Sequence, residues 1–267
     1  MRFAISTPAL AFAPGLNSSG DDVIRIGPLR FGKMAEAWAN AAHNQSIPFI
    51  SFEPVNTAGI DAACEKALAQ FDKQFDKNCG NWRPADDRPI ILVGHSTGGL
   101  IARHIAHLRP ERVHLALSIG CPHAGAPLAE QALHLSENRA ISRALRVCGY
   151  DLSKSVHVLS ALTEKAAARF AAERPLASHA CAYAACTASG AALSIPLKTF
   201  AFLTKGVPSD GLVAVESQRF GRQIGIYELD HIAQLGLALQ TRARDRKKAR
   251  MEFARLFTDV IRSPVKA

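Results

Sequence analysis

The sequence contains no uninterrupted apolar run of the ~20 residues that a bilayer-spanning helix needs. Internal repeats and low-complexity linkers are also missing, so we expect one domain over residues 1–267. The six cysteines lack both the spacing of a metal site and the density of a disulfide-bonded mini-protein. We expect buried thiols, with disulfides as the alternative, at Cys64, Cys79, Cys121, Cys148, Cys181 and Cys186.

Acidic residues are too few to balance the basic ones, 23 against 32, which leaves a formal charge of +9. Much of the excess lies in residues 242–250, within a helix that we predict over 241–262. We favour a solvated basic face, with the opposite face packed on a sheet through Met251, Phe253, Ala254, Phe257 and Ile261. The alternative is a patch that contacts an anionic membrane peripherally, and we expect no nucleic acid partner.

The N-terminal residues 1–13 have a faint similarity to a signal peptide that ends in Ala11-Phe12-Ala13. Pro8 interrupts the short apolar core, and cleavage after Ala13 would remove a segment that we predict as a core strand over 9–13. We therefore expect an uncleaved strand and a cytoplasmic protein, with secretion or a periplasmic location as the alternative.

The rest of the chain is organised around residues 89–102. An apolar, β-branched run over 90–93 predicts a buried parallel strand, and helical spacing begins at Leu100. Between them lies Gly-x-Ser-x-Gly, in which Gly94 and Gly98 have no side chain to collide across a sharp turn. Ser96 is then exposed at the apex, and the backbone N–H of Thr97 points at any oxyanion formed there. We predict that Ser96 is a nucleophile.

Strand and helix patterns alternate along the chain, which predicts an α/β fold with a mostly parallel sheet flanked by helices. The predicted strands cover 9–13, 47–52, 90–93, 113–119, 179–186 and 223–227. The predicted helices cover 31–42, 60–75, the segment from Leu100 and 241–262, and the type of 191–203 is left open.

Residues 127–175 are alanine-rich and amphipathic, with helices expected at 128–135, 139–147 and 155–172. Helices inserted after a core strand lie over the carboxyl edge of the sheet, so we predict a helical cap, or lid. The alternative is that this segment only extends the core. An apolar cap favours a substrate with an acyl part.

A nucleophilic serine needs a base, an acid and a second oxyanion donor. His231 follows the last predicted strand and reaches over the carboxyl edge, with His123 as its competitor; His95 is expected to face away around the turn.

Asp210 is the preferred acid because its loop would lie between the nucleophile strand and the last strand, and because Ser96, Asp210 and His231 follow the chain order that this type of fold requires. Glu216 is held in reserve. Asp230 adjoins His231 and cannot easily turn back on its ring. In the turn-rich loop after the first strand, Gly15 leaves the backbone permissive, and the N–H of Leu16 is the expected second donor.

These pieces resemble the bacterial triacylglycerol lipases of the α/β-hydrolase superfamily. The resemblance lies in Pro14-Gly15-Leu16, Gly94-His95-Ser96-Thr97-Gly98-Gly99, Gly120-Cys121-Pro122-His123-Ala124-Gly125, Ser209-Asp210-Gly211-Leu212-Val213 and Asp230-His231. It implies the α/β-hydrolase fold with Ser96, Asp210 and His231 as a catalytic triad, and it places His123 in a structural turn. Relatives that bind calcium carry an aspartate where this chain has Ala233, so we expect no metal and no cofactor.

The sequence thus predicts a serine hydrolase that cleaves carboxylic esters, lipid-like ones above all, through an acyl-enzyme. Acyltransferases, thioesterases, polyester depolymerases and amidases would use the same residues, and a non-catalytic binding protein on a hydrolase scaffold is a further alternative.

Overall fold

The structure of the protein is a computed structural model. The described residues are 8–15, 23–26, 29–54, 59–75, 89–126, 129–131, 133–134, 156–198 and 206–263.

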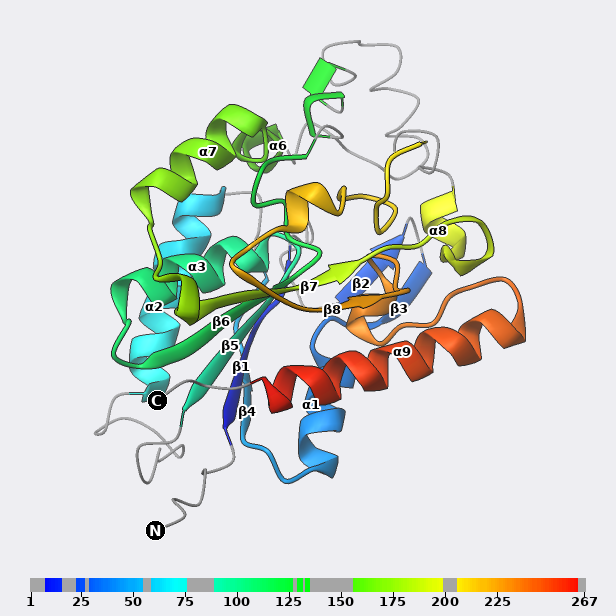
Figure 1. Ribbon diagram of the computed structural model, residues 1–267, viewed down its shortest axis with the longest axis horizontal. Coiled ribbons are helices and arrows are strands. Elements are labelled where there is room, and N and C mark those ends of the chain that lie inside the picture. The colour runs from blue at the N-terminus through cyan, green and yellow to red at the C-terminus, as the bar shows by residue number, and fades with distance from the viewer. Residues whose placement is uncertain are drawn as a thin grey trace.

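A six-stranded parallel sheet forms the centre of the molecule (Figure 1). Its strands, in spatial order, are β4 (Phe49–Ser51), β1 (Ala9–Ala13), β5 (Ile90–His95), β6 (Val113–Ile119), β7 (Cys181–Cys186) and β8 (Arg222–Tyr227). The predicted α/β fold class is confirmed. The chain runs outward from β1 to β4 and then from β5 to β8 in the other direction, so the strand order switches between β1 and β5. Ligands of open parallel sheets bind at such switch points, beyond the carboxyl ends of the strands.

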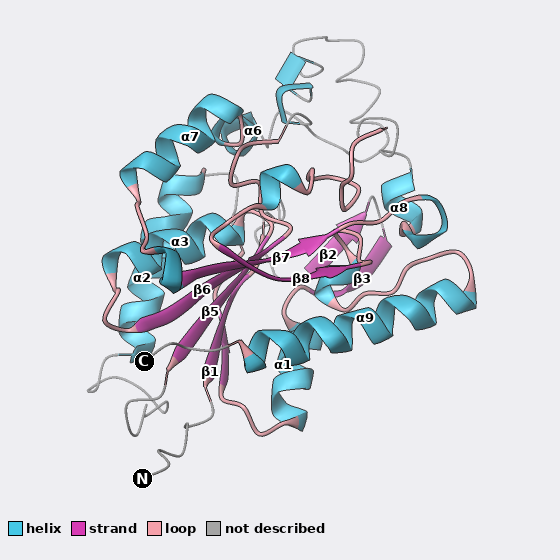
Figure 2. Ribbon diagram, viewed as in Figure 1, coloured by secondary structure: helices cyan, strands magenta, loops and turns pink. Residues whose placement is uncertain are grey.

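Helices cover both faces of this sheet (Figure 2). One face carries α2 (Ile60–Phe75), α3 (Gly98–Leu108), α6 (Val156–Ala161) and α7 (Glu164–Glu173). The other face carries α1 (Glu36–Asn44) and α9 (Ala243–Arg262), and the short α8 (Ile195–Lys198) follows β7. Because both faces are covered, β1 and β5 are buried along their whole length, which explains their uninterrupted apolar sequences.

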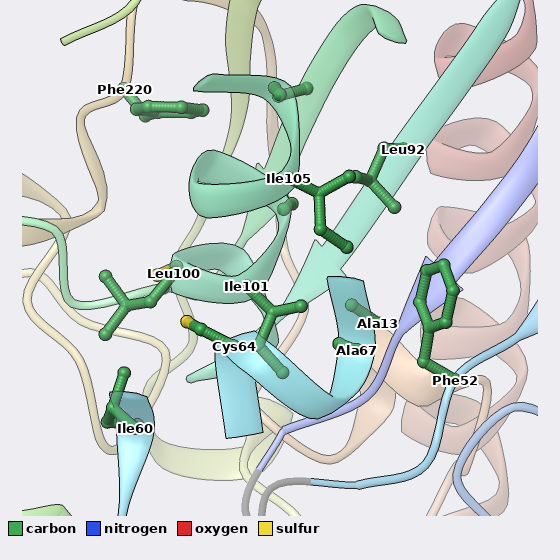
Figure 3. Close-up of a cluster of buried hydrophobic side chains, with 14 of the residues drawn as sticks. Ala13, Phe52, Ile60, Cys64, Ala67, Leu92, Leu100, Ile101, Ile105 and Phe220 are labelled. Atoms are coloured by element: carbon green, nitrogen blue, oxygen red, sulfur yellow. The ribbon is translucent and has the colours of Figure 1, made fainter. Parts of the chain in front are cut away.

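The core beneath α2 and α3 packs against β5, the strand that precedes Ser96, from one side (Figure 3). Cys64 of α2 and Ile101 and Ile105 of α3 are fully buried there, next to Leu92 of β5. Each buried aliphatic side chain of this size stabilises the fold by roughly 1.5–3 kcal/mol. On the opposite face Trp38 stacks on Phe12 with ring centroids 5.4 Å apart. The strand that carries the candidate nucleophile is therefore clamped between two packed layers.

An antiparallel hairpin of β2 (Val23–Ile26) and β3 (Leu29–Lys33) was not predicted. The helix expected over 31–42 is wrong at its beginning, because residues 31–33 belong to β3 and α1 starts only at Glu36. Gly32 explains the difference: its φ of +131° is incompatible with a helix and suits a strand at a register irregularity.

The helix expected over 155–172 is interrupted between α6 and α7. Thr163 has an extended backbone there, and its hydroxyl accepts the N–H of Ala166 as an N-cap. Within the earlier part of the insertion, residues 129–131 and 133–134 are helical, whereas the helix expected over 139–147 lies outside the described residues.

Both helices of this segment pack onto the body of the molecule. Val158, Leu162 and Phe170 are buried in the same core cluster as α2 and α3. The guanidinium of Arg103 on α3 also donates to the carbonyls of Arg174 and Ala171 at the end of α7. This part extends the core, while residues 135–155 lie outside the described ranges, so the cap stays a prediction.

The C-terminal helix α9 buries Ala249, Leu256, Phe257 and Val260. The expected packing of Met251 and Ala254 is wrong: Met251 is 63% exposed, and Ala254 is exposed as well. At about 100° per residue, Met251 lies roughly 200° around the helix from Ala249 and faces solvent. The cations Arg242, Arg244, Lys247, Lys248 and Arg250 are exposed, as expected of a solvated basic face.

Within the described ranges, none of the helices has both the length and the apolar character required to cross a membrane. Cys64, Cys121, Cys181 and Cys186 are buried free thiols, as predicted, whereas Cys79 and Cys148 lie outside the described residues. Burial raises the pKa of the Cys64 thiol to about 12, which leaves this thiol protonated and unreactive at neutral pH.

Candidate active site

Ser96 lies at a sharp turn between β5 and α3. Its φ of +53° is unusual for a residue other than glycine, and such strain concentrates at functional sites. A Cβ on Gly94 would lie 2.4 Å from the carbonyl oxygen of Gly98, and one on Gly98 would lie 2.0 Å from that of Ala13. Both glycines are therefore required by close backbone contact, as the Gly-x-Ser-x-Gly pattern predicts.

The loop after β1 lies against this turn. A Cβ on Gly15 would lie 2.7 Å from Ser96 Cβ and 3.2 Å from its Oγ, so the backbone of Gly15 approaches the hydroxyl closely. Thr97, the N-cap residue of α3, is buried beside the serine. Leu16 lies outside the described residues, so its N–H as second oxyanion donor stays a prediction.

Asp210 and His231 meet in a hydrogen bond of 2.8 Å between the carboxylate Oδ2 and the imidazole Nδ1. The backbone N–H of His231 also donates to the carbonyl oxygen of Asp210, at 2.9 Å. Two loops that follow different strands are thus joined through both main chain and side chain. The expected pairing of these two residues is present in the structure.

The Asp210 carboxylate is fully buried, with Oδ1 accepting the backbone N–H groups of Leu212 and Val213 at 3.0 and 2.8 Å. Burial pushes the pKa of this carboxyl upward. His231, the Val213 N–H and the Gln234 amide outweigh burial, and the net pKa lies below the usual value. Asp210 is therefore ionised at neutral pH and available to stabilise a protonated imidazole.

His95 connects the loop of His231 to the turn at Ser96. Its Nε2–H donates to the backbone carbonyl of His231 at 3.0 Å, and the two ring centroids lie 4.8 Å apart. The expectation that His95 faces away is wrong, because its side chain reaches across to the loop that follows β8. Since His95 immediately precedes Ser96, this contact holds the His231 loop next to the nucleophile turn.

The alternative base, His123, is in a different environment. Its ring stacks on Phe220 with centroids 4.1 Å apart, and neither ring nitrogen has a hydrogen-bond partner within the described residues. Burial and the nearby Arg103 lower the pKa of His123 to about 3. Without an acid partner to set its tautomer, His123 is the weaker candidate.

The alternative acids are also occupied elsewhere. Glu216 is exposed and pairs with Arg219. Asp230 is buried, and its Oδ1 accepts the backbone N–H groups of Ile232 and Ala233 at 3.0 and 2.7 Å. Its other oxygen accepts the N–H of Ser194, so Asp230 secures the backbone of the loop that carries His231.

Acid should destabilise the protein because His95 and His123 are buried in the neutral form. Burial lowers the pKa of each to about 3, from an ordinary value of 6.5. Below pH ~6.5 the unfolded chain takes up protons that the folded protein does not bind. The free energy of unfolding therefore decreases as the pH is lowered, until the folded protein also binds these protons at about pH 3. The loss between pH 6 and pH 4 should be roughly 2 kcal/mol for each histidine.

Urea unfolding of the His123→Phe variant at these two pH values measures this effect. On acidification the free energy of unfolding of the variant should fall by about 2 kcal/mol less than that of the wild type, since phenylalanine can stack on Phe220 without a titratable nitrogen. The matched control is His157→Phe on α6, which removes an exposed histidine instead of a buried one. If His123→Phe and the wild type lost the same free energy of unfolding between the two pH values, His123 would not contribute to the acid sensitivity.

Two contributors to this site, Gln234 and Trp38, had no recognisable signal in the sequence. Gln234 donates its amide Nε2–H to Asp210 Oδ2 at 2.8 Å. Trp38 of α1 donates its indole N–H to the carbonyl oxygen of Gln234 at 3.0 Å. These residues are 196 positions apart and carry no motif, so only the fold brings them together.

The parallel sheet, the strained turn at Ser96 and the Asp210–His231 pair define the α/β-hydrolase class of fold. Comparisons with known proteins agree. Residues 63–166, which include the turn at Ser96, match the PGAP1-like alpha/beta domain family. Over 189 residues the chain is 27% identical to triacylglycerol lipase 2 of Saccharomyces cerevisiae, a match that covers 65% of this chain and 54% of that protein. The chain thus spans about half the length of this curated relative.

Solved structures show the same fold. The mature lipase BlEst2 of Bacillus licheniformis superposes with a TM-score of 0.59 at 16% identity, over 96% of this chain and 92% of that one. Lipase 1 of Pelosinus fermentans gives 0.58 at 12% identity, over 97% and 99%. The metagenomic carboxyl esterase MGS0156 gives 0.57 at 18% identity, over 96% and 76%. The chain therefore has an α/β-hydrolase fold and resembles lipases and esterases, while the narrower resemblance to bacterial lipases stays a prediction.

Proposed function

We propose that the protein is a serine hydrolase that cleaves carboxylic esters. The observation that carries this proposal is the buried Asp210–His231 hydrogen bond, which His95 holds beside the strained turn at Ser96. Similarity to a triacylglycerol lipase and to lipase structures supports an ester substrate. We propose lipid-like esters in particular, because the similar proteins include lipases.

The hydrogen bond to Asp210 determines how His231 acts. Because Nδ1–H donates to the carboxylate, the lone pair of the neutral ring is on Nε2. Nε2 takes the proton of the Ser96 hydroxyl as Oγ bonds to the ester carbonyl carbon. The carbonyl π electrons move to oxygen, and the resulting oxyanion accepts N–H bonds from Thr97 and, as proposed, Leu16.

Collapse of this tetrahedral intermediate breaks the bond to the alkoxide, which leaves as an alcohol with the proton from His231. The acyl group is then esterified to Ser96. A water molecule gives its proton to His231 and attacks the acyl carbon, and the carboxylic acid departs as Ser96 regains its proton. Asp210 remains ionised throughout and stabilises the imidazolium.

Hydrolysis of a p-nitrophenyl ester series from short to long acyl chains tests this proposal. We expect kcat/KM to rise with chain length, because an apolar acyl pocket would contribute ~0.8 kcal/mol of binding free energy for each buried methylene. Preference for short chains would replace the lipid-like substrate with a small ester. Absence of turnover on every ester would contradict ester hydrolysis and favour thioesters, amides or a binding role.

An acyltransferase, a thioesterase or a polyester depolymerase would use the same side chains, since the acceptor and not the triad separates these reactions. Adding an alcohol to the assay separates transfer from hydrolysis, because a transferase would form a new ester in place of the free acid.

We also propose a peripheral contact with anionic membranes through the exposed cations of α9, which lie on the side of the helix away from Leu256 and Val260. Sedimentation with phosphatidylglycerol vesicles at low and high salt tests this contact, because salt screens exposed charges. Equal binding to neutral vesicles would contradict it. The cytoplasmic location expected from the sequence stays a prediction.

A further inference from the structure

The Asp210 carboxylate has a partner that the triad does not require. Its Oδ2 accepts hydrogen bonds from two side chains, His231 Nδ1 and Gln234 Nε2, each at 2.8 Å. Both Asp210 and Gln234 are fully buried. The oxygen that would stabilise a protonated base is therefore shared with an amide donor, in a region of low dielectric where hydrogen bonds are strong.

Gln234 is held in place from three sides. Its backbone N–H donates to the carbonyl of Asp230 at 3.1 Å, and its carbonyl accepts the indole N–H of Trp38 at 3.0 Å. Trp38 is itself fully buried, with Phe253 and Phe257 of α9 against its ring at 5.5 Å between centroids. The amide position is therefore set by the packing between α1 and α9.

Gly120, which directly follows β6, lies against the Gln234 side chain. Its φ is +58°, and a Cβ at this position would lie 2.3 Å from Gln234 Oε1 and 2.7 Å from Asp210 Oδ2. Only glycine leaves room for the amide and the carboxylate together. The orientation of the amide is also determined, because a carboxylate accepts but cannot donate, so the NH₂ group must face it.

We propose that Gln234 is a positioning residue of the hydrolase, which holds the Asp210 carboxylate for His231 and, by sharing Oδ2, limits how strongly the imidazolium is stabilised. This inference rests on the proposed function. It extends the triad by a side chain that donates to the acid and does not touch the reacting atoms.

The charged and titratable groups around His231 come from several elements. Asp210 faces it from the loop after β7, and Asp230 precedes it on its own loop, tied to backbone N–H groups. His95 at the end of β5 and Cys186 at the end of β7 are both buried, and burial favours their neutral forms by lowering the pKa of the imidazole and raising that of the thiol. The Gln234 side chain also interacts with the neutral His95 ring, so Asp210 is the charged group on which a change at Gln234 acts.

Removing the amide donor should make the base stronger. Without Gln234 Nε2–H, the charge on Oδ2 is less neutralised, so the carboxylate stabilises the imidazolium more strongly. In Gln234→Met, whose side chain is unbranched and of similar length, we expect the acidic limb of the kcat/KM profile to move up by about half a pH unit to one unit. Turnover should fall roughly tenfold, because the carboxylate loses one of its fixed donors.

The chain offers a matched control in Gln218, which is equally buried and also holds the acid loop. Its amide donates to the carbonyls of Val213 and Cys186 at 3.0 and 2.9 Å and makes no contact with the Asp210 carboxylate. Gln218→Met should lower thermal stability and leave the acidic limb in place. A limb that moves equally in both variants, or in neither, would overturn the positioning role.

An NMR titration of the His231 ring provides a readout that does not depend on activity. The expected result is a higher midpoint in Gln234→Met than in the wild type and in Gln218→Met, and an unchanged midpoint overturns the inference. If Gln234→Met does not fold, Gln234→Leu replaces it. A higher midpoint in Gln234→Met, together with a wild type that cleaves no ester, would contradict the proposed function alone. An active wild type with no shift in Gln234→Met would contradict this inference alone.

Discussion

Replacing Ser96 with alanine should lower kcat/KM for p-nitrophenyl esters by about 10⁴-fold or more, because no acyl-enzyme can form without the hydroxyl. Folding should be little affected. The φ of +53° at this position strains alanine as it does serine, and the close contacts of Gly94 and Gly98 remain. Initial rates and thermal unfolding of the two proteins, measured side by side, check both statements.

Ser118→Ala is the appropriate comparison, since Ser118 is a buried serine on β6, paired in register with Gly94. That variant should keep the wild-type rate. A fluorophosphonate should label the wild type and Ser118→Ala but not Ser96→Ala. Turnover that survives in Ser96→Ala would remove Ser96 as nucleophile, and with it the proposed mechanism.

The second large effect is expected for Asp210→Asn, which should reduce kcat by about 10³–10⁴-fold. Both oxygens of Asp210 face donors: backbone N–H groups at Oδ1, and His231 and Gln234 at Oδ2. An asparagine amide must turn its NH₂ toward one of these sets. Facing His231, it would donate to Nδ1 and place the ring proton on Nε2, the wrong tautomer for a base.

Steady-state kinetics over a range of pH values measure this loss, and denaturant unfolding separates it from a loss of folded protein. The control is Glu216→Gln, which neutralises the other acid considered from the sequence. Because Glu216 is exposed and pairs with Arg219, this change should leave kcat as it is. The assignment of the acid would be reversed if Glu216→Gln were the inactive variant and Asp210→Asn the active one.

Elements with a strong local signal were predicted closely. The strands over 9–13 and 113–119 and the helix over 60–75 have the predicted bounds, because each is a largely apolar run or a regular helical repeat between turn residues. The predictions over 31–33 and at Leu162–Thr163 failed where one residue overrides the repeat: Gly32 with its positive φ, and Thr163 as an N-cap.

The sequence by itself determined the turn at Ser96, since glycines at fixed spacing between an apolar strand and a helix leave few other conformations. It also determined the order of the elements and hence the parallel sheet. Only the tertiary structure decided how His231, the proposed base, is supported: His95 contacts the His231 carbonyl, Gln234 contacts Asp210, and Trp38 contacts Gln234. The physical reason is the separation in sequence between the residues that interact. Backbone conformation depends on neighbouring residues, whereas a buried hydrogen bond depends on which distant side chains the packed core brings within 3 Å of each other.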